Sequence, residues 1–282
     1  MEKGIAPIPQ SGLGNQIFIV VAGFVLSMYH NCPLYLFNNT NCGNWHSKKE
    51  YKHSIFKFIG THIDSCFMVL KNGSFGDYKK HYLSIFQSFD KWNLDSAPPG
   101  TYLESYYQYY PPFEKYENII REKLLLGLES YRNTLKEKYD FGHCGFLHVR
   151  RGDYLHFSDR HYIQPISYYR YCINELLKQK PEIKKIYVLS DDLEWISNCS
   201  LFVDEFKHIC EIYDNEDEIE SLSFMTLCDE GSICANSTFS WWGAFLGAFE
   251  KRNPVFYPDK WMKSDTEINL FPKEWIKVSE FV

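Results

Sequence analysis

The hydrophobic pattern is clearest in the second half of the chain, where short apolar runs alternate with segments whose apolar residues recur every three or four positions. The apolar runs predict strands at residues 145–150, 185–190, 232–236 and 254–258. The segments between them predict helices at residues 164–179, 191–198, 214–228 and 237–250. Strands and helices that alternate at this spacing predict an α/β fold with a parallel, doubly wound sheet, in which ligands bind at the carboxyl ends of the strands.

The first half opens with a strand–helix–strand pattern. An extended stretch at residues 4–10 leads through a glycine turn at residues 11–15 into a largely apolar helix at residues 16–29. A proline ends that helix before a second strand at residues 34–37. This order predicts the βαβ unit that opens many α/β folds.

The rest of the first half has a mixed pattern, in which a helix from about Phe113 is the clearest element. The polar stretch at residues 127–141 predicts an inter-domain region. A length of 282 residues suits two domains of ordinary size, which we place at residues 1–135 and 136–282. The last roughly 20 residues form a segment that could return to the N-terminal domain.

Composition indicates a globular protein, since 45% of the residues are hydrophobic and 23% are charged. The formal net charge of −6 argues against a general nucleic-acid binder, which needs a basic face to follow phosphates. Aromatic residues make up 18% of the chain, a content that suits surfaces on which sugars stack. Composition therefore leaves small polyanions and glycans as ligands.

The nine cysteines are odd in number, form no C-x-x-C pair and, with the ten histidines, lack zinc-site spacing. They predict reduced core thiols rather than a disulfide framework. The N-terminus lacks a signal-peptide pattern, and the apolar run at residues 17–29 is too short to span a membrane. We expect a soluble cytoplasmic protein, with peripheral attachment to a membrane as the alternative, and interpret the N-x-S/T sequons at Asn38, Asn72, Asn198 and Asn236 as chance occurrences.

Three predicted strands of the second half end in polar residues. These are His148, Arg150, Arg151 and Asp153 after the first strand, Ser190, Asp191 and Asp192 after the second, and Asn236, Ser237 and Thr238 after the third. Arginine binds phosphates through forked, permanently charged donors. Carboxylates accept hydrogen bonds from ribose or a purine, and a helix start offers hydroxyls and backbone N–H groups to a phosphate. Together the three ends indicate a nucleotide-diphosphate site.

Each strand end also has a purely structural interpretation. An arginine of the first could pair with Asp153 at the end of the strand, and the aspartates of the second could cap a helix. The third could open a capped helix that buries Trp241 and Trp242 in the core. The recurrence of three polar ends at the same topological position favours a functional site over these separate explanations.

The glycine turn "SGLGNQ" resembles the start of a dinucleotide-binding fingerprint, but Ile17 occupies the third glycine position of G-x-G-x-x-G. The chain also has no G-x-x-x-x-G-K-[ST] motif. A nicotinamide-dependent dehydrogenase and a P-loop kinase are therefore disfavoured. A turn that presents the amides of Asn15 and Gln16 to a ligand remains consistent with the sequence.

Four segments, "SGLGNQIF", "HVRRGDY", "VLSDDLEW" and "ICANSTFSWWGAFLG", resemble in content and order the α-1,2-fucosyltransferases of glycosyltransferase family 11. The resemblance implies a GT-B-like fold of two Rossmann-like halves, with doubly wound parallel sheets that face across a cleft. It places the acceptor in the N-terminal half and GDP-fucose in the C-terminal half. It also implies inverting transfer of L-fucose from GDP-β-L-fucose to the 2-hydroxyl of a terminal galactose, with no metal or other cofactor, and the chain has no D-x-D motif.

The resemblance also implies roles for individual residues. Arg150 would hold the donor β-phosphate and stabilise the departing GDP, with His148 and Asp153 completing the catalytic site. Asp191 and Asp192 would contact guanine or ribose. The full implied donor-binding set is Arg151, Asn15, Gln16, Gly12, Gly14, Asp191, Asp192, Ser237, Thr238 and Phe239.

The sequence leaves the general base and the acceptor open. Asp153, His148 and Glu104 are candidates for the base, in falling order, and a glutamine is expected at position 104 in the family. The alternatives are a fucosyltransferase of another linkage, a transferase for another nucleotide sugar and a non-catalytic carbohydrate-binding protein. The oligomeric state is not indicated by the sequence.

Overall fold

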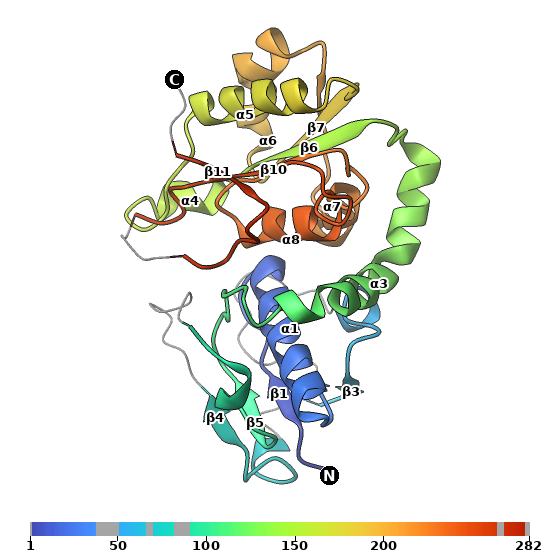
Figure 1. Cartoon of the computed structure of the whole chain (residues 1–282), viewed down its shortest axis with the longest axis vertical. Helices are drawn as coiled ribbons and strands as arrows, with labels where there is room; N and C mark the ends of the chain where they lie inside the picture. Colours follow the sequence, from blue (N-terminus) through green and yellow to red (C-terminus); the bar gives the residue numbers. More distant parts are fainter. Residues whose placement is uncertain (1, 38–50, 66–69, 82–90, 264–267, 280–282) are drawn as a thin grey trace. The chain divides into compact units, whose positions relative to one another are not determined.

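The computed structural model describes residues 2–37, 51–65, 70–81, 91–263 and 268–279. The chain divides into two compact units, Met1–Leu128 with Glu267–Pro272 as unit 1 and Glu129–Thr266 with Lys273–Val282 as unit 2 (Figure 1). Helix α3 (Glu117–Lys138) contains the boundary, and the boundary expected at residue 135 lies in the same helix. The polar stretch predicted as an inter-domain region is thus helical as far as Lys138.

Unit 1 contains two small parallel sheets and one long buried helix. Its elements are β1 (Ile5–Pro7), α1 (Leu13–His30), β2 (Tyr35–Phe37), β3 (Thr61–Ile63), β4 (Lys79–His81) and β5 (Thr101–Leu103), with 3₁₀ turns at Tyr51–His53, Leu94–Ser96 and Glu114–Tyr116. The sheets have the orders β1-β5-β4 and β2-β3, and a parallel bridge between Ile5 and Leu34 links them. The predicted βαβ opening is confirmed by β1, α1 and β2.

Helix α1 begins three residues earlier than predicted, directly after Gly12. It ends at Asn31, whose left-handed conformation (φ 49°) lets the Cys32 N–H donate to the Ser27 carbonyl at 3.0 Å. By length and composition α1 could cross a membrane, with a mean hydropathy of 1.4, but 78% of the helix is buried in the protein. A buried core helix has the same composition, so α1 is weak support for a membrane span.

Unit 2 is built on one six-stranded parallel sheet of order β11-β10-β9-β6-β7-β8. Its strands are β6 (Cys144–Val149), β7 (Lys185–Ser190), β8 (Cys210–Ile212), β9 (Ser232–Ile233), β10 (Val255–Pro258) and β11 (Ile276–Val278). Its helices are α4 (Gly152–His156), α5 (Ile166–Gln179), α6 (Leu193–Asn198), α7 (Glu218–Met225) and α8 (Thr238–Leu246), with a π-helical turn at Leu201–Glu205. The predicted doubly wound parallel sheet is confirmed, whereas α4, β8 and β11 were not predicted.

The two faces of this sheet are covered by different helices, with α5 and α6 on one side and α7 and α8 on the other (Figure 1). Side chains alternate along β6, so Leu147 and Val149 join the core under α5 and α6. His148 lies on the opposite face, with its ring 5.8 Å from that of Phe239 in α8. The strand therefore delivers His148 to the side of the sheet on which α8 begins.

The cysteines of the described residues, seven in all, are free thiols, and five of them are buried. Burial raises the pKa of the Cys210 thiol to about 12, so this sulfur stays protonated and unreactive at ordinary pH. Cys42 and Cys66 lie outside the described residues. Where the structure describes them, the thiols fit the prediction of reduced core cysteines.

Candidate functional site

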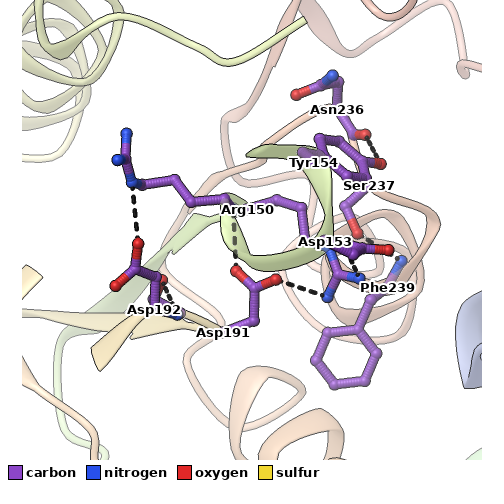
Figure 2. A network of polar contacts seen from close by, with 10 residues as sticks. Arg150, Asp153, Tyr154, Asp191, Asp192, Asn236, Ser237 and Phe239 are labelled. Carbon is purple, nitrogen blue, oxygen red and sulfur yellow. Dashed lines mark hydrogen bonds and ion pairs between the residues drawn. The ribbon is translucent and has the colours of Figure 1, made fainter. Parts of the chain in front are cut away.

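The three polar strand ends meet at one edge of the unit 2 sheet. Strand β6 lies between β9 and β7, and all three run parallel, so their carboxyl ends are neighbours. The loop after β6 is joined to the loop after β7 by ion pairs, and to the loop after β9 by a hydrogen bond from the Tyr154 hydroxyl to the Asn236 carbonyl at 2.8 Å. The prediction that the three ends converge is confirmed (Figure 2).

Arg150 lies between two carboxylates. Its Nη2 is 2.7 Å from Oδ1 of Asp153, and its Nη1 is 3.1 Å from Oδ2 of Asp191 (Figure 2). The first contact is an ion pair without hydrogen-bond geometry, since Asp153 Oδ1 is buried and has no hydrogen-bond partner. The structural interpretation of this motif, an arginine paired with Asp153, is therefore also correct. The two contacts involve both terminal nitrogens of the guanidinium, Nη1 and Nη2.

Arg151 braces the same two loops. Its Nε donates to Oδ2 of Asp192 at 3.1 Å, and its backbone N–H donates to Oδ1 of Asp191 at 2.9 Å. Its guanidinium lies over the ring of Trp195, 4.2 Å from the centroid. Asp192 also caps α6 by accepting from the Trp195 N–H at 3.0 Å. Arg151, Asp191 and Asp192, which were expected to contact the donor, are engaged here with one another.

Gly152 permits the close approach of the two loops. A methyl group on its Cα would overlap Oδ2 of Asp191 and lie 3.0 Å from Cγ of that residue. Real Cβ atoms essentially never lie within 3.0 Å of another heavy atom, so the Asp191 carboxylate would have to shift. The glycine of the R-R-G-D sequence is thus required by the position of Asp191.

The third strand end combines a helix cap with a buried amide. The Ser237 hydroxyl caps α8 by accepting from the Phe239 N–H at 3.3 Å. Nδ2 of Asn236 donates to the carbonyls of Tyr162 and Trp261, each at 2.8 Å. Trp241 is fully buried in α8, as is Trp242, which confirms that these tryptophans are core residues. Ser237, Thr238 and Phe239 form the start of α8. Ser237 and Phe239 lie near Arg150 and its carboxylate partners (Figure 2).

His148 is almost fully buried, with 3% of its surface exposed. Its Nδ1 is buried without a hydrogen-bond partner. The pKa of His148 is lowered to about 4, mainly by burial; Asp191 opposes this shift and the positive charge of Arg150 adds to it. The His148 ring is therefore uncharged between pH 5 and 8.

This neutral histidine predicts acid-sensitive stability. Because the folded pKa lies below the ordinary value of about 6.5, the unfolded chain binds more protons between the two values, and stability falls as the pH drops through that window. Wild-type protein should lose free energy of unfolding between pH 7 and pH 4.5, and we expect this loss to be about 1–3 kcal/mol smaller in His148→Gln. Thermal unfolding at several pH values measures this. The exposed His208→Gln is the control, and equal pH slopes in wild type and His148→Gln would contradict the assignment.

The predicted glycine-turn residues belong to unit 1 and form a network of their own. Ser11 has a left-handed backbone (φ 66°), and its hydroxyl accepts from Nδ2 of Asn15 at 3.1 Å. Nε2 of Gln16 donates to the Ser11 carbonyl at 2.8 Å, and Gln16 is 3% exposed. Gln16 thus supports the turn, whose two glycines are Gly12 at the helix start and Gly14 in the first turn of α1. The turn and the arginine cluster lie in different units.

Sequence reasoning missed three residues of these networks. Gln108 donates from Nε2 to Oδ1 of Asn15 at 2.8 Å, which fixes the orientation of the Asn15 amide. Trp195 lies under Arg151, and Tyr154 lies beside Arg150. A signal existed for the last two, since Trp195 is three residues after the helix cap and Tyr154 ends the "HVRRGDY" segment. Within the described residues, no group of three or more His, Cys, Asp or Glu side chains could hold a metal ion.

Comparison with known proteins places this geometry in context. The model for Glycosyl transferase family 11 matches residues 100–279, which is more than half of the chain. The chain is 28% identical over 309 residues to WbnK, an O-antigen biosynthesis glycosyltransferase of Escherichia coli, with coverage of 95% of this chain and 98% of WbnK. It is 24% identical to an alpha-1,2-colitosyltransferase of Escherichia coli, with coverage of 95% and 97% respectively.

Among solved structures, the chain is similar to NodZ of Bradyrhizobium, an alpha-1,6-fucosyltransferase that has been soaked with GDP-fucose. The TM-score is 0.51 at 10% sequence identity, over 88% of this chain and 93% of NodZ. At this identity the likeness shows the fold, which is of the GT-B type. The predicted fold class is therefore confirmed.

Proposed function

The chain belongs to glycosyltransferase family 11, and from this premise we propose that it transfers L-fucose from GDP-β-L-fucose to the 2-hydroxyl of a terminal galactose, with inversion at the fucose anomeric carbon. The coarser activity, that of a glycosyltransferase of the fucosyltransferase type, follows from the family itself. The observation that carries the finer proposal is Arg150, held between Asp153 and Asp191 beside the start of α8.

In the proposed reaction, the galactose oxygen forms a bond to the fucose anomeric carbon as the bond to the β-phosphate oxygen breaks. The departing GDP gains negative charge, which Arg150 would stabilise at the place where the charge develops. The carboxylates contact Nη1 and Nη2 of a planar group that carries five N–H donors, so the same group can also donate to phosphate oxygens. The carboxylates hold the N–H edge of the guanidinium in place before the donor arrives, which reduces the reorganisation needed at the moment of reaction.

The surrounding residues take roles that differ in part from those implied by the sequence. Arg151 and Asp192 would brace the loops rather than bind guanine or ribose, because their charged groups face each other at 3.1 Å. Asp191 would act on the donor through Arg150. The start of α8, with Ser237 and the backbone of Thr238 and Phe239, would bind the pyrophosphate through helix-terminal N–H groups.

The candidates for the general base are unequal in this geometry. His148 is buried, and its pKa of about 4 is far below the value that suits a base near neutral pH. Glu104 is 2.7 Å from the ammonium of Lys80, and both side chains are exposed. Asp153 is paired with Arg150, so we propose that it braces the arginine and that positioning and leaving-group stabilisation account for most of the catalysis.

The direct test is transfer from GDP-fucose to lactose in the presence of EDTA. We expect a 2′-fucosylated product and a rate unchanged by the chelator, because the arginine cluster would supply the positive charge that the leaving group needs. GDP-mannose and UDP-galactose serve as control donors. Absence of transfer to any galactose-terminated acceptor, together with absence of GDP-fucose binding, would overturn the proposal. A rate that EDTA removes and added Mg²⁺ or Mn²⁺ restores would overturn its metal independence.

A second candidate is transfer of colitose to a 2-hydroxyl. It is favoured by the alpha-1,2-colitosyltransferase of Escherichia coli, which matches 95% of this chain. A competition assay with equal concentrations of GDP-fucose and the corresponding colitose donor separates the two activities. Preferential formation of the colitosylated product would replace fucose with colitose in the proposed reaction and leave the site unchanged.

A further inference from the structure

Tyr154, which has no role in the reaction proposed above, contacts both Arg150 and the loop after β9. The Arg150 guanidinium lies over the Tyr154 ring, 5.4 Å from its centroid. The Tyr154 hydroxyl donates to the Asn236 carbonyl at 2.8 Å. Burial raises the pKa of this hydroxyl, so it remains a protonated donor at ordinary pH.

The ring of Tyr154 is also held in place by His161. His161 stacks on it with the ring centroids 4.0 Å apart and the planes 11° from parallel. His161 itself pairs with Met262 in an antiparallel bridge, and the adjoining Lys263 N–H donates to the Arg160 carbonyl at 3.0 Å. Tyr154 is thus held by an aromatic partner that is anchored in the backbone.

The Asn236 end of the anchor is equally constrained. Nδ2 of Asn236 donates to the carbonyls of Tyr162 and Trp261, and Asn236 is 1% exposed. The carbonyl that receives the Tyr154 hydroxyl therefore belongs to a residue with a fixed side chain. The hydrogen bond to this carbonyl and the stacking on His161 therefore restrict the movement of the Tyr154 ring.

These contacts complement the carboxylates that flank Arg150. Asp153 and Asp191 attract the guanidinium at its N–H edge, which leaves the group able to swing about that edge. An aromatic face attracts the same cation from a different direction and so restricts the swing. We propose that Tyr154 is a positioning residue that fixes the orientation of Arg150 toward the diphosphate of the donor. This inference rests on the proposed function, because it acts through Arg150.

A purely structural role for Tyr154 predicts different behaviour, and the chain offers a matched control. Tyr168 also donates its hydroxyl to a backbone carbonyl after β9, that of Cys234, at 2.6 Å. Tyr168 belongs to α5 and packs with Leu147 and Val149 in the core under that helix. Tyr168→Phe therefore removes the same kind of hydrogen bond from a core residue.

The test is the affinity for GDP, measured by calorimetric titration of the full-length protein, together with thermal unfolding of each variant. We expect Tyr154→Leu to weaken GDP binding about five- to thirtyfold, the range of one desolvated cation–π contact. Tyr154→Phe keeps the ring and should stay within about threefold of wild type, and Tyr168→Phe within about twofold. In an Arg150→Ala background, Tyr154→Leu should cause no further loss.

Each outcome decides the inference. A folded Tyr154→Leu protein with wild-type affinity overturns it, as does an equal further loss in the Arg150→Ala background, since Tyr154 would then not act through Arg150. Equal losses in Tyr154→Leu and Tyr168→Phe would reduce the residue to a structural part of the loop. Wild-type protein that binds no GDP overturns the proposed function, and this inference with it. If wild-type protein binds GDP but the Tyr154 variants do not behave as expected, this inference is overturned and the proposed function stands.

Discussion

Replacement of Arg150 by alanine is expected to lower kcat/KM for the donor by roughly 10²–10³-fold while the protein stays folded. The loss has two causes. The departing diphosphate loses the cation that would stabilise it, and the negative charges of Asp153 and Asp191, no longer offset by the arginine, repel the donor phosphates. The measurement is initial-rate kinetics with GDP-fucose at a fixed acceptor concentration, combined with thermal unfolding.

The control for this variant is Arg160→Ala. Arg160 follows in the same region of the chain, its side chain is 66% exposed, and it forms an ion pair with Asp159 at 3.6 Å. We expect Arg160→Ala to match wild type in both kinetics and stability. Arg150→Lys should fall between alanine and wild type, because a point charge cannot face both carboxylates and a phosphate. Wild-type activity in folded Arg150→Ala would remove the role assigned to this arginine.

The second large effect is expected from Gly152→Ala, a change of one methyl group. The methyl would overlap Oδ2 of Asp191, so Asp191 must move away from the backbone N–H of Arg151 and from the Arg150 guanidinium. Overpacking of this kind costs about 1–3 kcal/mol of stability. A shift of about 1 Å in a positioned group costs up to about 10²-fold in rate, so we expect transfer to fall roughly ten- to a hundredfold.

Gly142→Ala tests whether this effect is specific to the site. Its added methyl would lie 3.1 Å from Oδ1 of Asp140, and Gly142 itself is exposed, so the aspartate can move away without disturbing a charge network. We expect a change in stability within about 0.5 kcal/mol and unchanged transfer. If Gly152→Ala behaves like Gly142→Ala in unfolding and kinetic measurements, the close approach to Asp191 is not required for activity.

The sequence predicts unit 2 well because its signals are local and periodic. The strand at Lys185–Ser190 has the predicted bounds, and Asp217 and Asp192 cap helices where acidic residues open the predicted segments. The elements that were missed are short or depend on tertiary contacts. Strand β11 has three residues, and β9 keeps only two residues of the five predicted. Pairing with neighbouring strands, rather than their own composition, defines these strands.

The site shows the same division between local and distant information. The convergence of three strand ends follows from topology, which an alternating pattern predicts. The partners within the cluster do not follow, because a sequence does not say which of three carboxylates an arginine will face. The structure pairs Arg150 with Asp153 and Asp191 and leaves Asp192 to Arg151. The support from Gln108 to Asn15 crosses 93 positions and has no periodic signal at all.

The buried amide of Asn236 has a consequence for how this protein can be produced. Both hydrogens of its Nδ2 are donated to carbonyls, and a glycan on this nitrogen would leave at most one of them. The N-x-S/T sequon there is closed to oligosaccharide transfer once the chain has folded. In a eukaryotic secretory host, however, modification precedes folding, so attachment at Asn236 would block the packing of the loop after β9. In such a host, the yield of folded protein would therefore depend on whether the chain folds before a glycan is transferred to Asn236.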